Sequence, residues 1–175
     1  LDLRRRNLCA PISSISSSLQ QMLAILTFGV VIWAVLGSLG VLENQHSINL
    51  NMAVLYLVNA FAAMLVGLGI GFLVSTVVKN DQAASAAANV VSLGMSFLCG
   101  VFVPQQLLSS SVVSISRFLP AYWYVSAVNA IDGLSSYTPS SITPILQDIG
   151  IELGFAVAFA LLSLLLFRQR QLSSD

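Results

Sequence analysis

Long apolar stretches separated by short polar segments run through most of the chain. Four of these stretches, 22–42, 53–78, 83–103 and 149–167, have the composition of membrane spans, and the first three contain no charged residue. A helix that crosses a bilayer needs about 20 predominantly apolar residues. The pattern predicts an all-α integral membrane protein with four transmembrane helices.

The third stretch carries a regular pattern of small side chains. Small residues recur at every fourth position, at Ala84, Ala88, Ser92, Ser96 and Gly100. Such a stripe lets a second helix approach closely. We therefore interpret these residues as candidates for helix packing along a path through the membrane. The pair Gly67 and Gly71 makes a similar but weaker pattern in the second stretch.

The segment 104–131 has a different, half-apolar pattern. Its apolar residues fall on one helical face, and the aromatic residues Tyr122, Trp123 and Tyr124 follow. Aromatic side chains of this kind favour the membrane–water boundary. We interpret 104–131 as a re-entrant or interfacial hairpin, with an ordinary amphipathic surface helix as the alternative. The following segment 134–147, with Pro139 and Pro144, is expected to be a polar loop.

The segment 1–21 precedes the first span. It contains Arg4, Arg5, Arg6 and Pro11, followed by several serines. Because proline is favoured in the first turn of a helix, we expect a short interfacial helix here. The arginines also fit a simple topology anchor. Before the third span, Asn80 or Asp81 is expected to cap the helix.

Charge supports the membrane assignment and predicts an orientation. Charged residues make up 8% of the 175-residue chain, against about 25% in soluble domains. The net charge is +0, which gives no basis for nucleic-acid binding. With four spans, six of the seven basic residues fall on one side, and only Arg117 lies opposite. The positive-inside rule makes the six-charge side, with both ends of the chain, cytoplasmic.

Few residues suggest catalysis or ion coupling. The chain lacks the Gly-x-x-x-x-Gly-Lys-Ser/Thr phosphate loop and the His-Glu-x-x-His zinc motif. Asn59 and Asn89 are expected to make hydrogen bonds between helices. Glu152 is placed in the first turn of the last span, near the interface. We therefore expect no catalytic, cofactor-binding or metal-binding residue in this chain.

Two motifs resemble a known family. The sequence FLCGVFVP at 97–104, together with FLPAY at 118–122, resembles the signature segment of ABC type-2 exporter permeases. The flank RNLCAPIS at 6–13 is similar to the coupling segment before the third span of that family. On this resemblance the four spans correspond to the third through sixth of a six-span permease. The chain is then expected to be a fragment that lacks the N-terminal spans.

The resemblance implies a function and partners. It implies a permease subunit of an ATP-binding cassette exporter in the cytoplasmic membrane, paired with a second permease subunit and with an ATPase subunit that holds ATP and Mg²⁺. Arg4, Arg5, Arg6 and Pro11 are candidates for coupling to the ATPase. Phe97, Phe102 and Pro104 are candidates for an outer gate. The substrate, and whether the second permease is identical, stay open.

A second function remains compatible with the sequence. The chain also fits a membrane assembly or interaction protein without transport activity, which would not bind an ATPase. An independent channel or secondary carrier is disfavoured, because such proteins usually need ionisable groups inside the membrane.

Overall fold

The computed structural model describes residues 14–44, 49–78, 80–134 and 136–172, and these form a helical bundle. Its elements are α2 (Ser14–Glu43), α3 (Leu50–Val77), α4 (Asp81–Leu98), the short 3₁₀ helix η1 (Gln105–Leu107), α5 (Ser110–Ser116), α6 (Pro120–Asp132) and α7 (Pro139–Leu172). The predicted all-α class is confirmed for this part of the chain.

Three of the described helices are long and apolar enough to cross a membrane. These segments are Leu23–Glu43 in α2, Leu50–Val77 in α3 and Pro139–Leu166 in α7. Large apolar side chains point outward from the bundle, such as Leu36, which is 62% exposed, and Val157, which is 58% exposed. Because lipid rather than water solvates such surfaces, the protein is a multi-pass membrane protein.

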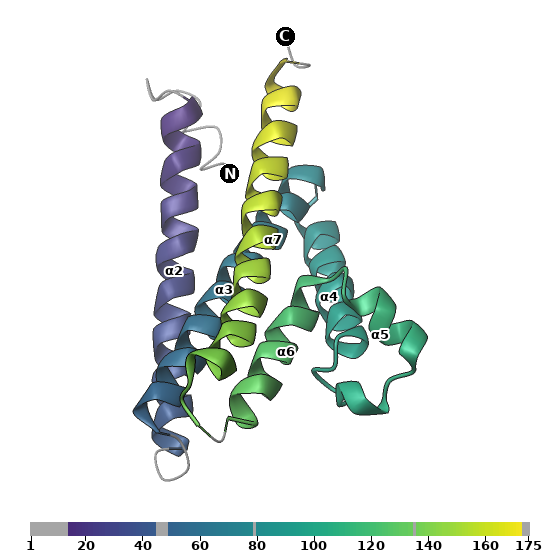
Figure 1. Cartoon of the computed structure of the whole chain (residues 1–175). Coiled ribbons are helices and arrows are strands. Elements are labelled where there is room, and N and C mark those ends of the chain that lie inside the picture. Colours follow the sequence, from purple (N-terminus) through teal and green to yellow (C-terminus); the bar gives the residue numbers. More distant parts are fainter. Residues whose placement is uncertain (1–13, 45–48, 79, 135, 173–175) are drawn as a thin grey trace.

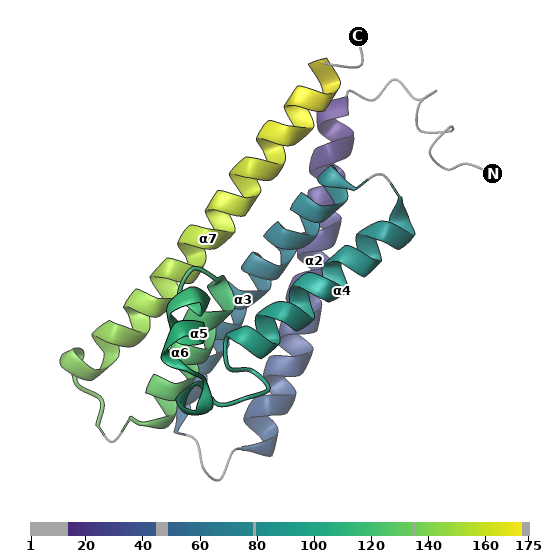
Figure 2. The same ribbon diagram turned by 90° about the vertical axis from the view of Figure 1, so that its right-hand side faces the viewer.

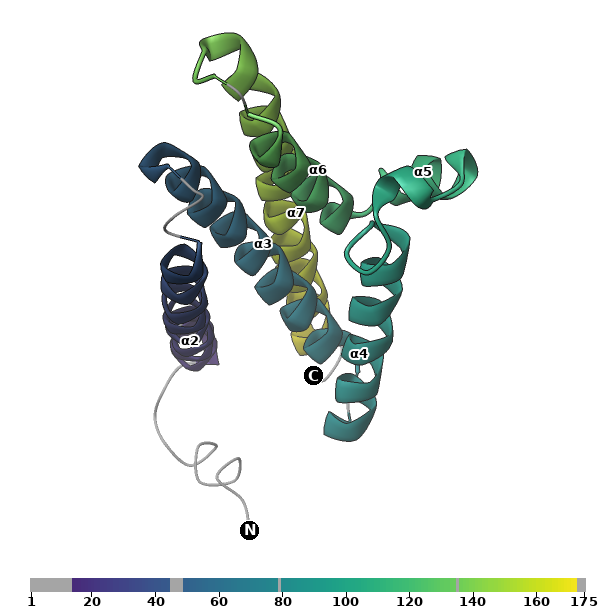
Figure 3. The ribbon, with the colours of Figure 1, turned by 90° about the horizontal axis from the view of Figure 1, so that it is seen from below.

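Helix α3 is the centre of the bundle. It packs against α7 most extensively, and also against α2, α4 and α6. Viewed along the bundle, α2 and α4 lie on opposite sides of α3 (Figure 3). The buried core combines one residue of α3, two of α6 and two of α7: Ala62, Ala127, Ile131, Ile145 and Ile149.

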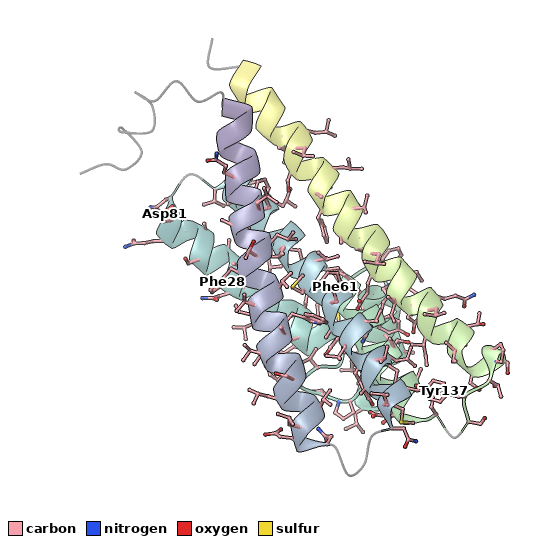
Figure 4. The ribbon with its side chains drawn as sticks, turned by 90° about the vertical axis from the view of Figure 1, so that its left-hand side faces the viewer. Phe28, Phe61, Asp81 and Tyr137 are labelled. Carbon is pink, nitrogen blue, oxygen red and sulfur yellow. The ribbon has the colours of Figure 1, made fainter. Side chains whose placement is uncertain are left out.

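The two ends of the bundle carry different parts of the chain. The start of α2 and the end of α7 lie together at one end, here named the tail end (Figures 1 and 2). The end of α2 and the starts of α3 and α7 lie at the other, here named the loop end. Figure 4 labels Asp81, at the start of α4, toward the tail end, and Tyr137 at the loop end. The start of α2, the start of α4 and the end of α7 thus share one end of the bundle.

Helix α4 is shorter than the predicted span 83–103. It ends at Leu98, and it is not among the three helices with the length and apolarity of a span. It begins with Asp81 and Gln82 and holds Asn89 and three serines, which lowers its apolarity. The expected N-cap is confirmed, since the Asn80 side chain accepts a hydrogen bond from the backbone N–H of Gln82 at 3.0 Å.

Gly100 ends α4 through a Schellman turn. Its φ is +99°, and the backbone N–H of Val101 donates to the carbonyl of Ser96 at 3.1 Å. Glycine is favoured at this position because a side chain disfavours positive φ. Gly100 therefore lies in a turn rather than on the face of a continuous helix.

Beyond this turn, η1 and α5 follow, and α5 packs against α4, whereas α6 packs mainly against α3 and α7. Helix α6 runs antiparallel to the first half of α3. At the loop end, Tyr56 of α3 donates a hydrogen bond to Asp132 at the end of α6. Further along the two helices, the side chain of Asn59 in α3 donates to the backbone carbonyl of Tyr124 in α6. With 13 residues, α6 is about 20 Å long, less than the hydrocarbon core of a bilayer.

The expected loop at 134–147 is wrong for most of its length, because α7 already begins at Pro139. Proline is well tolerated at the first helical position, and Pro144 stands inside the helix. The helix persists because Ile145 and Ile149 bury one face against the core. Burial of apolar side chains in the bundle offsets the backbone hydrogen bond that Pro144 cannot make.

Gly69, which lies between Gly67 and Gly71, makes the close contact between α3 and α7. A Cβ added at Gly69 would lie 3.0 Å from the Cβ of Phe159. A Cβ at Gly67 or Gly71 would meet nothing within 4 Å in this chain. The face of α3 that packs against α7 is therefore the one that carries Ala62, Val66 and Gly69, which are all buried.

Candidate functional site

A group of polar side chains lies inside the bundle, where α3, α6 and α7 meet. We name Asn59, Tyr124, Asp148 and Glu152 the polar core. Asn59 is fully buried and Glu152 is 1% exposed, while Tyr124 and Asp148 are half-buried. Buried polar groups inside a membrane protein are costly unless they have partners, so they mark sites of function or of specific packing.

Glu152 is the most unusual member of this group. Both of its carboxyl oxygens are buried and have no hydrogen-bond partner among the described residues. It lies 13 residues after Pro139 and 14 before Leu166, at the middle of the α7 segment. It lines a cavity together with Ala63 and Val66 of α3, which lie near the middle of that helix as well.

The expectation that Glu152 lies near the interface, in a first helical turn, is therefore wrong. Because α7 begins at Pro139, Glu152 falls in the interior of the helix and of the bundle. A signal in the sequence was available. Ile145, Ile149, Glu152 and Ala156 follow the spacing of one helical face, and all four are buried.

Asn59 connects α3 to α6. Its side-chain Nδ2 donates a hydrogen bond to the backbone carbonyl of Tyr124 at 3.2 Å, which confirms the expected bond between helices. The Oδ1 atom of the same amide is buried without a partner among the described residues. Asn89, the other asparagine in question, is exposed on α4.

Acidic residues continue from the polar core toward the loop end. Asp148 lies one turn before Glu152 and is hydrogen-bonded to Ser126 of α6. Asp132 is exposed at the end of α6, where it accepts the hydrogen bond from Tyr56. Asp132, Asp148 and Glu152 therefore lie between the loop end and the middle of α7.

Two cavities adjoin the polar core. The central cavity, of about 140 Å³, is lined by Glu152 and by apolar residues of α3, α4 and α6. The loop-end cavity, of about 320 Å³, lies among α2, α3 and α6 and is lined by Asn44, Tyr56 and Asp132 among others. Tyr124 lines both cavities. A third cavity, of about 270 Å³ between α2, α3 and α7, is wholly apolar and includes Ile25, Phe72 and Val157.

The small residues predicted for helix packing lie along α4 and its end. Ala84, Ala88, Ser96 and Gly100 are half-buried, and Ser92 is exposed. Met95, on the same helix, lines the central cavity instead. The role of this stripe in packing or along a path stays a prediction.

The predicted gate residues gather at the turn after α4. The rings of Phe97 and Phe102 lie 4.9 Å apart between centroids, and both side chains are 57% exposed. Pro104 is the N-cap residue of η1. Gln105 closes the turn, because its Nε2 donates to the carbonyl of Cys99 at 3.0 Å and to that of Tyr122 at 3.4 Å.

The candidate coupling residues Arg4, Arg5, Arg6 and Pro11 lie outside the described residues. Within the described part of the chain, no group of three or more His, Cys, Asp or Glu side chains is arranged to hold a metal ion. The polar core can bind a proton or a cationic group, but it has no nucleophile paired with a base, which covalent catalysis requires.

The comparison with protein families gives an identity to this architecture. Residues 4–132 match the family model described as ABC-2 type transporter. The match includes α2 through α6, whereas Glu152 and the rest of α7 lie beyond it. No curated protein and no solved structure shows significant similarity to the chain. Because the family model covers most of the chain, this protein belongs to the ABC-2 type transporter family, whose membrane domains serve as transport permeases.

Proposed function

We propose that the chain is the membrane permease of an ATP-driven exporter. In this proposal a separate ATPase subunit binds ATP and Mg²⁺, and a second permease subunit completes the path. The observation that carries the proposal is the match of residues 4–132 to the ABC-2 type transporter family. ATP hydrolysis, export direction and the need for a second permease subunit are parts of the proposal.

The helix arrangement supports four crossings and a re-entrant hairpin. Helices α2, α3 and α7 make three crossings, and α4 followed by its turn makes the fourth. Helix α6 starts beside the central cavity, which Pro120 and Ala121 line, and it ends near Tyr56 at the loop end. A short helix that begins in the middle of a bundle fits a hairpin that returns to the side from which it entered, covered by protein.

The distribution of basic residues supports an orientation. The start of α2, the start of α4 and the end of α7 share the tail end. In the sequence, Arg4, Arg5 and Arg6 precede α2, Lys79 precedes α4, and Arg168 and Arg170 belong to the last turns of α7. We propose that the tail end faces the cytoplasm, where the ATPase subunit binds segment 1–21.

The test is co-purification of an ATPase with the tagged full-length protein from native membranes in mild detergent. We expect a stoichiometric ATP-hydrolysing partner, and we expect the combined variant Arg4→Ala, Arg5→Ala and Arg6→Ala to lose it. The matched control replaces Arg168 and Arg170 by alanine, which removes charge from the same side but not from the coupling segment. Topology mapping of both variants separates loss of coupling from inverted insertion.

Two results would count against the proposal. A pure preparation without any ATPase favours an assembly protein over an exporter permease. If the Arg168 and Arg170 variant loses the partner as fully as the first variant, the coupling segment has no special role.

A further inference from the structure

The central cavity combines an acidic group with apolar walls. Glu152 lies at one side, and the remaining wall includes Ala63 and Val66 of α3, Met95 of α4 and Ala121 of α6. Tyr124 also lines the cavity. A site of this kind is complementary to a ligand that carries one positive charge on an otherwise apolar body.

The protein supplies no cation to Glu152 within the described residues. The titratable groups that interact electrostatically with Glu152 are Asp148 on α7 and Tyr124 on α6, and neither is basic. The residues of α3 and α4 that line the cavity are apolar or glycine. Arg117, the basic residue whose side chain the structure describes, is exposed on the hairpin.

We propose that the central cavity binds the ammonium group of a small lipophilic cation, with Glu152 as its counter-ion. An ionised carboxylate in apolar surroundings is stable only when a cation pairs with it. The two oxygens of Glu152 are buried without a partner beside the cavity and provide that pairing when the side chain turns toward the ligand, and a second carboxyl group, that of Asp148, lies one turn away. The ring of Tyr124 adds a cation–π contact.

The chemistry of the walls selects an organic cation over a metal ion. Calcium and magnesium require six or more oxygen ligands, whereas Glu152 is the only acidic residue that lines this cavity. Alkyl substituents on a nitrogen instead pack against alanine, valine and methionine. A cavity of about 140 Å³ is close in volume to one of about 150 Å³ that accommodates benzene, so it fits a single compact head group.

The proposed binding exchanges a proton for the cation. In this proposal the carboxyl group of Glu152 carries a proton while the cavity is empty, because an unpaired carboxylate is unfavourable in apolar surroundings, and a permanently charged ligand displaces that proton to the solvent. Binding of one cation therefore releases up to one proton, and no bond other than the O–H bond of the carboxyl group is broken. This exchange makes the site measurable without any transport assay.

The experiment titrates the purified full-length protein in mild detergent with phenyltrimethylammonium, by calorimetry and without ATP. The matched neutral probe is tert-butylbenzene, in which carbon replaces the charged nitrogen. We expect Glu152→Gln to weaken binding of the cation at least about tenfold and to leave the weak binding of the neutral probe unchanged. Repeating the titration in two buffers of different ionisation enthalpy reports the released proton.

The control variant is Glu43→Gln, which removes an exposed carboxylate from the end of α2 and should bind the cation as the wild type does. Asp148→Asn should weaken binding only a few-fold. Equal affinity of the cation and the neutral probe, equal affinity of Glu152→Gln and wild type, or no binding of the cation would each overturn the proposal. If Glu152→Gln fails to fold, the probe pair and the proton release still decide the question on the wild-type protein.

The result is independent of the proposed exporter function. A permease can fail to bind this probe and still bind an ATPase. A protein without any ATPase partner can still hold a cation in this cavity.

Discussion

Gly100 and Gln105 are in such close contact that residue 100 has no room for a side chain. A Cβ built on Gly100 would lie 2.4 Å from Cγ of Gln105, and the backbone of Gly100 has a φ of +99°. The same Gln105 side chain donates hydrogen bonds to Cys99 and Tyr122. The end of α4 and the start of α6 are thus held together by one turn whose geometry requires glycine.

Replacing Gly100 by alanine is expected to destabilise the protein. The left-handed backbone costs a non-glycine residue about 1–2 kcal/mol, and displacement of Gln105 adds the loss of its hydrogen bonds. Thermal unfolding in mild detergent, followed by tryptophan fluorescence, measures the change. Gly94→Ala is the control, because a Cβ there meets nothing within 4 Å and alanine favours a helix. Equal melting temperatures of the two variants would show that the turn is not strained by a side chain.

Replacing Gly69 by valine is expected to separate α3 from α7. The new side chain would overlap Phe159, and overpacking of this kind typically costs about 1–3 kcal/mol. Gly71→Val makes the same change on the same helix at a position with open space. Chemical unfolding of both variants gives the comparison. If Gly71→Val proves as damaging as Gly69→Val, the contact between α3 and α7 does not depend on Gly69.

Replacing Asn59 by alanine is expected to cost about 0.5–1.5 kcal/mol of stability. The variant loses the hydrogen bond to the Tyr124 carbonyl, whose counterparts between membrane helices average about 0.6 kcal/mol. Asn51→Ala, at an exposed position of the same helix, is the control and should be neutral. Proteolysis of the native state in detergent measures the difference. A neutral Asn59→Ala would mean that the bond between α3 and α6 contributes nothing to stability.

The thiol of Cys99 is expected to be protected from modification in the folded protein. Cys99 is fully buried at the end of α4, and a buried thiol reacts slowly. In a Cys9→Ser background, a maleimide reagent should label Cys99 at least about tenfold more slowly in mild detergent than in SDS. Ser114→Cys in a chain without Cys9 and Cys99 provides an exposed thiol for comparison. Equally rapid labelling of Cys99 and of the exposed control would contradict the burial.

The α4 turn illustrates a signal that was present in the sequence. Glycine is the usual residue one position beyond a helix C-cap, so Gly100 marked a helix end inside the predicted span 83–103. The regular spacing of Ala84, Ala88, Ser92, Ser96 and Gly100 favoured a continuous helix instead. The two interpretations differ in the backbone conformation of one residue, Gly100. A pattern of side-chain sizes does not report backbone conformation.

Helix α7 shows the opposite case, in which tertiary packing overrode local preference. Two prolines and several serines between 134 and 147 are typical of a loop. Ile145 and Ile149 nevertheless bury a helical face against α3 and α6. This extension of the helix moved Glu152 from an expected helix end to the middle of the bundle.

The sequence by itself determined the class of the protein, the family and the chemistry that is available. The length of an apolar stretch decides whether it can span a membrane, and the motifs at 97–104 and 118–122 are local in the sequence. Both can therefore be recognised without coordinates. Tertiary structure alone decided that Gly69 rather than Gly67 or Gly71 touches α7, and that Glu152 is buried without a partner beside a cavity. Helical periodicity tells which side chains share a face, but burial depends on which neighbouring helix covers that face, and that contact joins residues far apart in the chain.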